Sequence, residues 1–100
     1  MLKNDLEHEL NFDIEIQKPK MYKVLLLNDD YTSMEFVVST LMNIFRKSEE
    51  EAYEIMLRIH NQGSGLCGIY THEIAETKVA QVLNSAKKSK FPLRAVMEEE

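Results

Sequence analysis

Three polar side chains follow directly on an apolar segment of this 100-residue sequence. The run of residues 24–27 predicts a strand that is largely covered on both faces, and Asn28, Asp29 and Asp30 come immediately after it. Asn and Asp are poor strand formers and good turn formers, so we expect the chain to turn at Asn28. Carboxylate and amide oxygens at such a corner can bind a cationic group, although a solvated turn that only ends the strand is the alternative.

One histidine belongs to an otherwise apolar helical stripe. The stripe has the spacing i, i+3, i+4, i+7 and i+8 and consists of Ala52, Ile55, Met56, Ile59 and His60. His60 would bring a ring nitrogen to an apolar wall, and the alternative is a core histidine that is bonded to a carbonyl. Met34 and Met56 add adaptable apolar side chains. Together with the acidic corner, these residues favour a site for an ammonium group beside an apolar hollow.

Other chemistries are poorly represented in the sequence. Cys67 and His60 could form a nucleophile pair, but Cys67 lies within a predicted strand and no oxyanion element is visible. The acidic corner lacks the spaced acids and central glycine of a calcium loop, and no Cys or His spacing resembles a zinc site. His8 and His72 are expected to be solvated. We therefore expect no catalytic residue, no metal and no cofactor.

Charge and composition restrict the partners and the location. The formal net charge is −5, but residues 21–97 carry nine acids and nine bases, so no basic face is available for nucleic acid. No apolar run approaches the length of a membrane span, and residues 1–20 lack the apolar region of a signal peptide. A single cysteine suits a reducing compartment. These observations predict a cytoplasmic protein that binds neither nucleic acid nor membrane.

The remaining pattern predicts one small α+β domain. Two capping boxes, Thr32 with Glu35 and Ser48 with Glu51, begin helices over residues 33–45 and from residue 48 to Gly63 or Gly65. A strand over 66–70, a helix over 71–88 and a strand over 93–97 follow. The order β-α-α-β-α-β predicts three helices packed on a small, mainly antiparallel three-stranded sheet. The expected inner residues of the first and third helices are Val37, Leu41, Ile44, Phe45, Ala75, Val79, Val82, Leu83 and Ala86.

The sequence before Pro19 differs in character from the rest. Residues 1–18 are polar and charged, which predicts a flexible extension, and residues 19–100 are expected to form the core domain. Within the extension, Leu10, Phe12, Ile14 and Ile16 alternate with polar residues. An edge strand, or a segment that docks on a partner, is the alternative for this stretch.

Four segments resemble the ClpS family, the adaptors of the bacterial N-end rule pathway. They are YKVLLLNDDYTSMEFVV, EIMLRIH, GLCGIYTHEIAETKVAQV and FPL, and the resemblance covers about residues 20–97. It implies a protein without catalytic activity that binds the N-terminal residue of N-degron peptides and proteins, when this residue is Leu, Phe, Tyr or Trp. It further implies delivery of these substrates to the AAA+ unfoldase ClpA with its peptidase ClpP. A general protein-interaction module, in which the acidic corner is structural, is the alternative.

The resemblance also implies roles for individual residues. The residues implied to contact the substrate's α-amino group are Asn28, Asp29 and His60, while Asp30 and Thr32 would lie at the pocket edge. The residues implied to line the side-chain pocket are Leu26, Met34, Val37, Met56, Ile59 and Leu93. Glu73 and Lys78 would dock on the unfoldase, with both side chains exposed. Ser33 departs from the family pattern, because many relatives have proline at this position. We expect position 33 to be the first helical position, where proline is favoured.

Overall fold

The structure is a computed structural model that describes residues 18–100. The predicted extension over residues 1–18 therefore lies outside the described residues except for Lys18, and so do the alternative strand over 10–16 and His8. The described chain runs in the order β1 (Met21–Leu27), α2 (Met34–Asn43), α3 (Glu49–Gln62), β2 (Ser64–Thr71), α4 (His72–Lys88) and β3 (Arg94–Glu99). This order confirms the predicted β-α-α-β-α-β fold.

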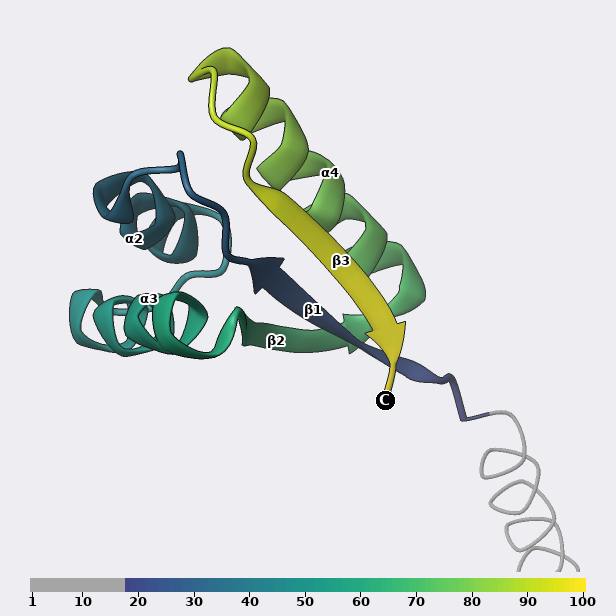
Figure 1. Cartoon of the computed structure of the whole chain (residues 1–100). Coiled ribbons are helices and arrows are strands. Elements are labelled where there is room, and N and C mark those ends of the chain that lie inside the picture. The colour runs from purple at the N-terminus through teal and green to yellow at the C-terminus, as the bar shows by residue number, and fades with distance from the viewer. Residues whose placement is uncertain (1–17) are drawn as a thin grey trace, which may run out of the picture.

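The sheet is fully antiparallel and has β1 at its centre, in the order β2-β1-β3. Helix α4 lies along the sheet, whereas α2 and α3 lie side by side beyond the end where β1 finishes and β2 begins (Figure 1). The chain that leaves β1 therefore arrives between the sheet and the α2–α3 pair. This position brings the polar corner after Leu27 close to both helices.

Residues of all the described strands and helices share one core. Leu26, Leu41 and Ala75 are fully buried, and Phe45 is almost so. On α4 the buried residues are Ala75, Val82 and Ala86, with Val79 partly buried against them. The prediction of an inward-facing Leu83 is wrong, because this side chain is 45% exposed. It follows Val82 by one position, a step of about 100° around the helix, and so lies off the buried stripe.

The two predicted capping boxes have different outcomes. Ser48 and Glu51 form the predicted box, in which each side chain accepts the other residue's backbone N–H at 3.1 Å. The box at Thr32 is wrong, because the Thr32 hydroxyl donates to Asp29 instead. Ser33 caps α2 by accepting the Phe36 N–H at 3.1 Å, so it precedes the first helical position. The helix is accordingly Met34–Asn43 rather than residues 33–45.

Cys67 is the extra residue of a bulge in β2. Val24 pairs with Gly68 while Leu25 pairs with Leu66, so Cys67 has no partner in β1. Its side chain points into the core and is 1% exposed. This burial raises the pKa of the thiol to about 12. The thiolate that a nucleophile needs is therefore disfavoured at neutral pH, which argues against the Cys67 and His60 pair.

Candidate functional site

Asp29 organises the corner after β1. Its Oδ1 accepts the backbone N–H groups of Tyr31 at 2.8 Å and Thr32 at 2.7 Å, and its Oδ2 accepts the Thr32 hydroxyl at 2.7 Å. Partial burial would raise the pKa of Asp29, but these hydrogen bonds outweigh it and hold the pKa below its ordinary value of 3.8. Asp29 is therefore ionised at neutral pH, and it fixes the path of the chain into α2.

A backbone hydrogen bond attaches this corner to the end of α3. The Asn28 N–H donates to the Gly63 carbonyl oxygen at 2.8 Å. Gly63 ends α3 in the left-handed conformation, with a φ of 92°, as predicted from its position. Because His60 lies in the last turn of α3, this bond holds Asn28 and His60 on the same side of the molecule.

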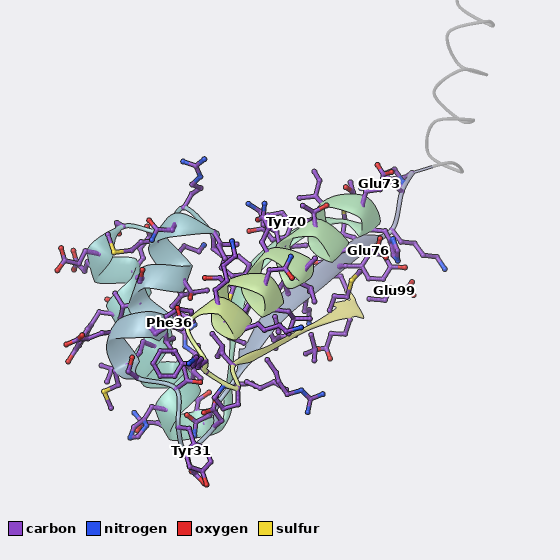
Figure 2. The ribbon with its side chains drawn as sticks, turned by 90° about the horizontal axis from the view of Figure 1, so that it is seen from above. Tyr31, Phe36, Tyr70, Glu73, Glu76 and Glu99 are labelled. Carbon is purple, nitrogen blue, oxygen red and sulfur yellow. The ribbon has the colours of Figure 1, made fainter. Side chains whose placement is uncertain are left out.

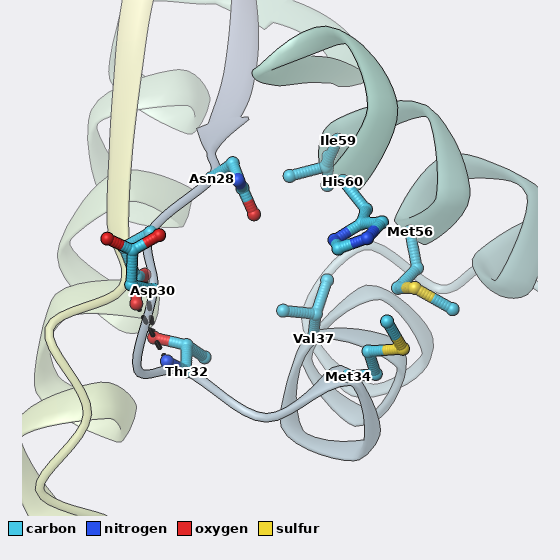
Figure 3. A pocket seen from close by; sticks show the side chains of 9 residues that line it. Asn28, Asp30, Thr32, Met34, Val37, Met56, Ile59 and His60 are labelled. Atoms are coloured by element: carbon cyan, nitrogen blue, oxygen red, sulfur yellow. Dashed lines mark hydrogen bonds between the residues drawn. The ribbon is translucent and has the colours of Figure 1, made fainter.

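The corner and the two helices enclose a cavity of about 290 Å³ (Figure 3). One side of it is polar and comes from the corner, and the other is mainly apolar and comes from α2 and α3. The lining residues are Asn28, Asp29, Asp30, Thr32, Met34, Val37, Met56, Ile59 and His60. All nine were predicted site residues. The predicted association of an acidic corner with a histidine and two methionines is thus present in the structure.

His60 is exposed and its ring faces the cavity (Figure 3). The alternative of a core histidine is therefore wrong. The imidazole lies across the hollow from the corner, on the same side as Ile59 and Met56. Its ring nitrogens are thus accessible from the space between α3 and Asn28.

Two predicted pocket residues do not line this cavity. Leu26 is 0% exposed and Leu93 is 2% exposed, and both belong to the core. Leu26 shares the buried face of β1 with Val24, two positions earlier, because side chains of a strand alternate between its faces. Leu93 lies immediately before β3 and packs inside the domain.

The predicted docking residues Glu73 and Lys78 differ in their surroundings. Glu73 is exposed in the first turn of α4, at the end of the molecule away from Tyr31 of the corner (Figure 2). The expectation of an exposed Lys78 is wrong, because its Nζ is partly buried and donates to the Ile44 carbonyl oxygen at 2.7 Å. Both residues border a shallow groove on α4 that also includes Ile74, Glu76, Thr77 and Gln81.

Within residues 18–100 no cluster of three or more His, Cys, Asp or Glu side chains could hold a metal ion. No helix in the same part of the chain is long and apolar enough to cross a membrane.

Comparison with known proteins identifies the family. Residues 17–96 match the family model of the ATP-dependent Clp protease adaptor protein ClpS. The chain belongs to the ClpS family. It is 52% identical over 96 residues to the ClpS adapter protein of Wolinella succinogenes, with 96% of this chain and 94% of the relative covered. It is 60% identical over 84 residues to that of Maricaulis maris, with 84% and 77% covered.

A solved structure agrees with the sequence comparison. Agrobacterium tumefaciens ClpS2 bound to L-phenylalaninamide superposes with a TM-score of 0.81 and is 42% identical. The match covers 83% of this chain and all of that chain. The ClpS family is one of protease adaptors, and the resemblance found in the sequence is confirmed by both comparisons.

Sequence reasoning missed one feature beside the cavity. Met34, Val38 and Met42 follow one another at intervals of four residues, so they form one row along α2. This row was a readable signal, but only Met34 was considered. Together with Tyr53 and Met56 of α3, the row lines a second hollow.

Proposed function

We propose that this protein is an adaptor that binds the N-terminal residue of other polypeptides. The α-amino group would bind Asn28, Asp29 and His60, and a large side chain would enter the hollow beside Met34 and Met56. The observation that carries this proposal is the cavity itself, in which hydrogen-bond acceptors and an apolar wall face one space. A volume of about 290 Å³ suits one large side chain better than a longer segment.

Asp29 retains capacity for a ligand although it already accepts three hydrogen bonds. A carboxylate offers about four acceptor sites, and Oδ2 accepts only the Thr32 hydroxyl. Because its pKa lies below the ordinary value, Asp29 supplies a full negative charge at neutral pH. An ammonium group would therefore gain a charge-assisted bond without disturbing the turn.

The same groups would discriminate against internal residues. A free α-amino group has a pKa of about 8 and is largely cationic near neutral pH, whereas an internal amide carries no charge and a single N–H. Placing an internal residue in the cavity would leave acceptors without donors, which costs about 1–3 kcal/mol for each buried group. Recognition would thus depend on the terminal position as well as on the side chain.

Two comparisons support the proposal. The family model is that of a Clp protease adaptor, and the similar Agrobacterium protein is bound to L-phenylalaninamide. This molecule combines a free amino group, a large aromatic side chain and an amide where a following residue would begin. By analogy we propose that substrates beginning with Phe, Leu, Tyr or Trp bind here.

We further propose that the adaptor delivers these substrates to a ClpA-type unfoldase with its ClpP peptidase in the cytoplasm. The docking surface would be the exposed side of α4 that begins at Glu73. Glu73 and the cavity corner at Tyr31 lie at opposite ends of the molecule (Figure 2). A substrate and an unfoldase could therefore be bound at the same time.

The test is a titration of matched peptides that begin with Leu, one with a free and one with an acetylated amino group. Acetylation removes the charge and two of the donors, so we expect a loss of at least about tenfold, the equivalent of about 1.5–3 kcal/mol for one charge-assisted bond. A peptide that begins with Ser is the control for the apolar hollow, because it has a free amino group but no large side chain to fill the hollow. Equal affinity of free and acetylated peptides would instead favour the general interaction module, in which the corner is structural.

A further inference from the structure

A second hollow lies next to the cavity on the surface formed by α2 and α3. It has a volume of about 470 Å³, and its apolar walls come from Met34, Val38, Met42, Tyr53 and Met56. Its polar residues are Glu35, Ser39 and Asn43, all on α2. Met34 and Met56 line both spaces, so the two hollows adjoin at these side chains.

Three of the apolar side chains that line this hollow are exposed. Met34 is 49% exposed, Met42 37% and Tyr53 54%. Single exposed apolar residues are normal on a protein surface, but a contiguous group in a concave site marks a binding surface. Methionine adapts its shape to different partners, which suits a site that accepts variable side chains.

The position of the methionines gives the direction in which a bound peptide would continue. Met34 and Met56 form the side of the cavity that lies away from Thr32 and Asp30 of the corner (Figure 3). A peptide whose amino group is held at the corner and at His60 has its second and later residues outside the cavity. Those residues reach the neighbouring hollow if the peptide continues across the two methionines.

In an extended peptide, successive side chains point to opposite sides, and this decides which residue can reach the second hollow. Side chains of residues one and three point to the same side, and they are about 7 Å apart. The side chain of residue two points to the opposite side. With residue one in the cavity, residue three is the one that faces the protein surface again, about one side chain's width further on.

We propose that the second hollow is a subsite for an apolar side chain at the third position of the substrate. The occupant is thus the same polypeptide whose terminal residue fills the cavity, and this inference rests on the proposed function. The second residue would remain in solvent and contribute little. The subsite would give the adaptor a preference among substrates that share the same first residue.

The experiment compares fluorescent peptides that begin Phe-Ser-Ser, Phe-Ser-Leu and Phe-Leu-Ser and are otherwise identical. We expect leucine at the third position to tighten binding about fivefold, because an open hollow removes only part of the side chain from water. Leucine at the second position should change the affinity less than about twofold. No gain at position three, or an equal gain at position two, would overturn the proposal.

Protein variants localise the effect. The combined substitution Met42→Gln and Tyr53→Gln removes exposed apolar groups that do not line the first cavity. It should abolish the gain from leucine at position three and leave the affinity for Phe-Ser-Ser unchanged. Leu83→Gln, which changes an exposed leucine on α4, is the matched control and should retain the gain. A gain that persists in the double variant would overturn the assignment to this hollow.

The proposed function and the subsite can fail separately. If acetylation abolishes binding but position three has no influence, the subsite is wrong and recognition of the terminal residue stands. If the acetylated Phe-Ser-Leu peptide binds as tightly as the free one, the proposed function is wrong, and the subsite as defined here falls with it.

Discussion

The Nζ atom of Lys78 donates a 2.7 Å hydrogen bond to the carbonyl oxygen of Ile44, which precedes it by 34 positions. Ile44 caps the C-terminal end of α2, where carbonyl groups lack helical partners. Lys78 therefore satisfies one of these groups and ties α4 to the helix pair that carries the cavity. Its ammonium group also lies 5.9 Å from the centre of the Tyr70 ring.

We predict that Lys78→Ala lowers the free energy of unfolding by about 1.5–3 kcal/mol, the usual contribution of a hydrogen bond to a charged group. Urea denaturation of the variant measures this. Lys87→Ala, which changes an exposed lysine on the same helix, is the control and should change the stability by less than about 0.5 kcal/mol. Equal urea midpoints for the two variants would show that the contact of Lys78 with Ile44 does not stabilise the fold.

This contact changes how the unfoldase surface should be tested. Charge reversal at Lys78 would destabilise the fold as well as alter the surface, so a loss of unfoldase binding would have two causes. Glu73→Lys changes an exposed residue and is the cleaner variant. It should weaken unfoldase binding and leave peptide affinity unchanged, and it should lower the stability by no more than about 1 kcal/mol, because Glu73 lies in the first turn of α4. Loss of all three together would indicate misfolding.

A second prediction concerns the dependence of stability on pH. The folded-state pKa of Asp29 lies below its ordinary value of 3.8, so the ionised form stabilises the fold. This contribution is complete above the ordinary pKa and is lost as the pH falls through the folded-state pKa. Asp29→Asn removes it. We therefore expect the variant to be less stable at pH 7, and the difference from the wild type to shrink as the pH falls below the ordinary pKa of 3.8.

Asp30→Asn is the control for this experiment, because Asp30 is an exposed neighbour in the same corner. Urea denaturation at several pH values provides the measurement. A difference between the wild type and Asp29→Asn that stays constant over this range would mean that the Asp29 carboxylate does not stabilise the corner by its charge.

A third prediction concerns selectivity at the first side-chain carbon of the ligand. Met34 borders the cavity at the start of α2, where it faces Met56 of α3 (Figure 3). A β-branched ligand would crowd this side chain, and overpacking of this kind costs about 1–3 kcal/mol. We expect Met34→Ala to raise the affinity for isoleucinamide relative to leucinamide by at least about fivefold. Met42→Ala, on the same helix but outside the cavity, should leave this ratio unchanged. An unchanged ratio in both variants would exclude Met34 as a gate.

Local chemistry explains why much of the site could be predicted. The turn after Leu27 follows from Asn28 to Asp30, and the helical stripe that ends at His60 follows from spacing alone. The proximity of this turn to His60 could not be predicted in the same way, because it depends on the hydrogen bond between the Asn28 N–H and the Gly63 carbonyl oxygen. This long-range contact leaves no periodic trace in the sequence.

The errors have tertiary causes. The Thr32 hydroxyl was expected to cap a helix, but the nearby Asp29 carboxylate is a stronger acceptor and engages it. Leu26 and Leu93 were assigned to the pocket through the resemblance, and both side chains are buried in the core, so their role in the pocket stays a prediction. Lys78 was expected on the surface because the resemblance gave it a docking role. Its partner in the structure is a backbone carbonyl, and no residue type in the sequence reveals such a contact.

The last prediction separates recognition from delivery. Within residues 18–100, the cavity is lined by residues between Asn28 and His60. We therefore propose that recognition does not require residues 1–17. The sequence before Pro19 was predicted to be a flexible extension, and an unfoldase needs an unstructured segment to engage. We expect deletion of residues 1–17 to change the affinity for a Phe-starting peptide by less than about twofold. Degradation of a Phe-starting substrate by unfoldase and peptidase should fall sharply.

An extension of the same length and composition but scrambled order is the matched control. It should restore degradation, because engagement of an unstructured segment depends on its flexibility more than on its sequence. The alternative is that the alternating stretch of residues 10–16 docks as an edge strand. In that case both deletion and scrambling would lower the melting temperature of the protein. If the variant without residues 1–17 supported degradation at the full rate, the extension would have no role in delivery of the substrate, and the proposed docking surface on α4 would remain the candidate for this step.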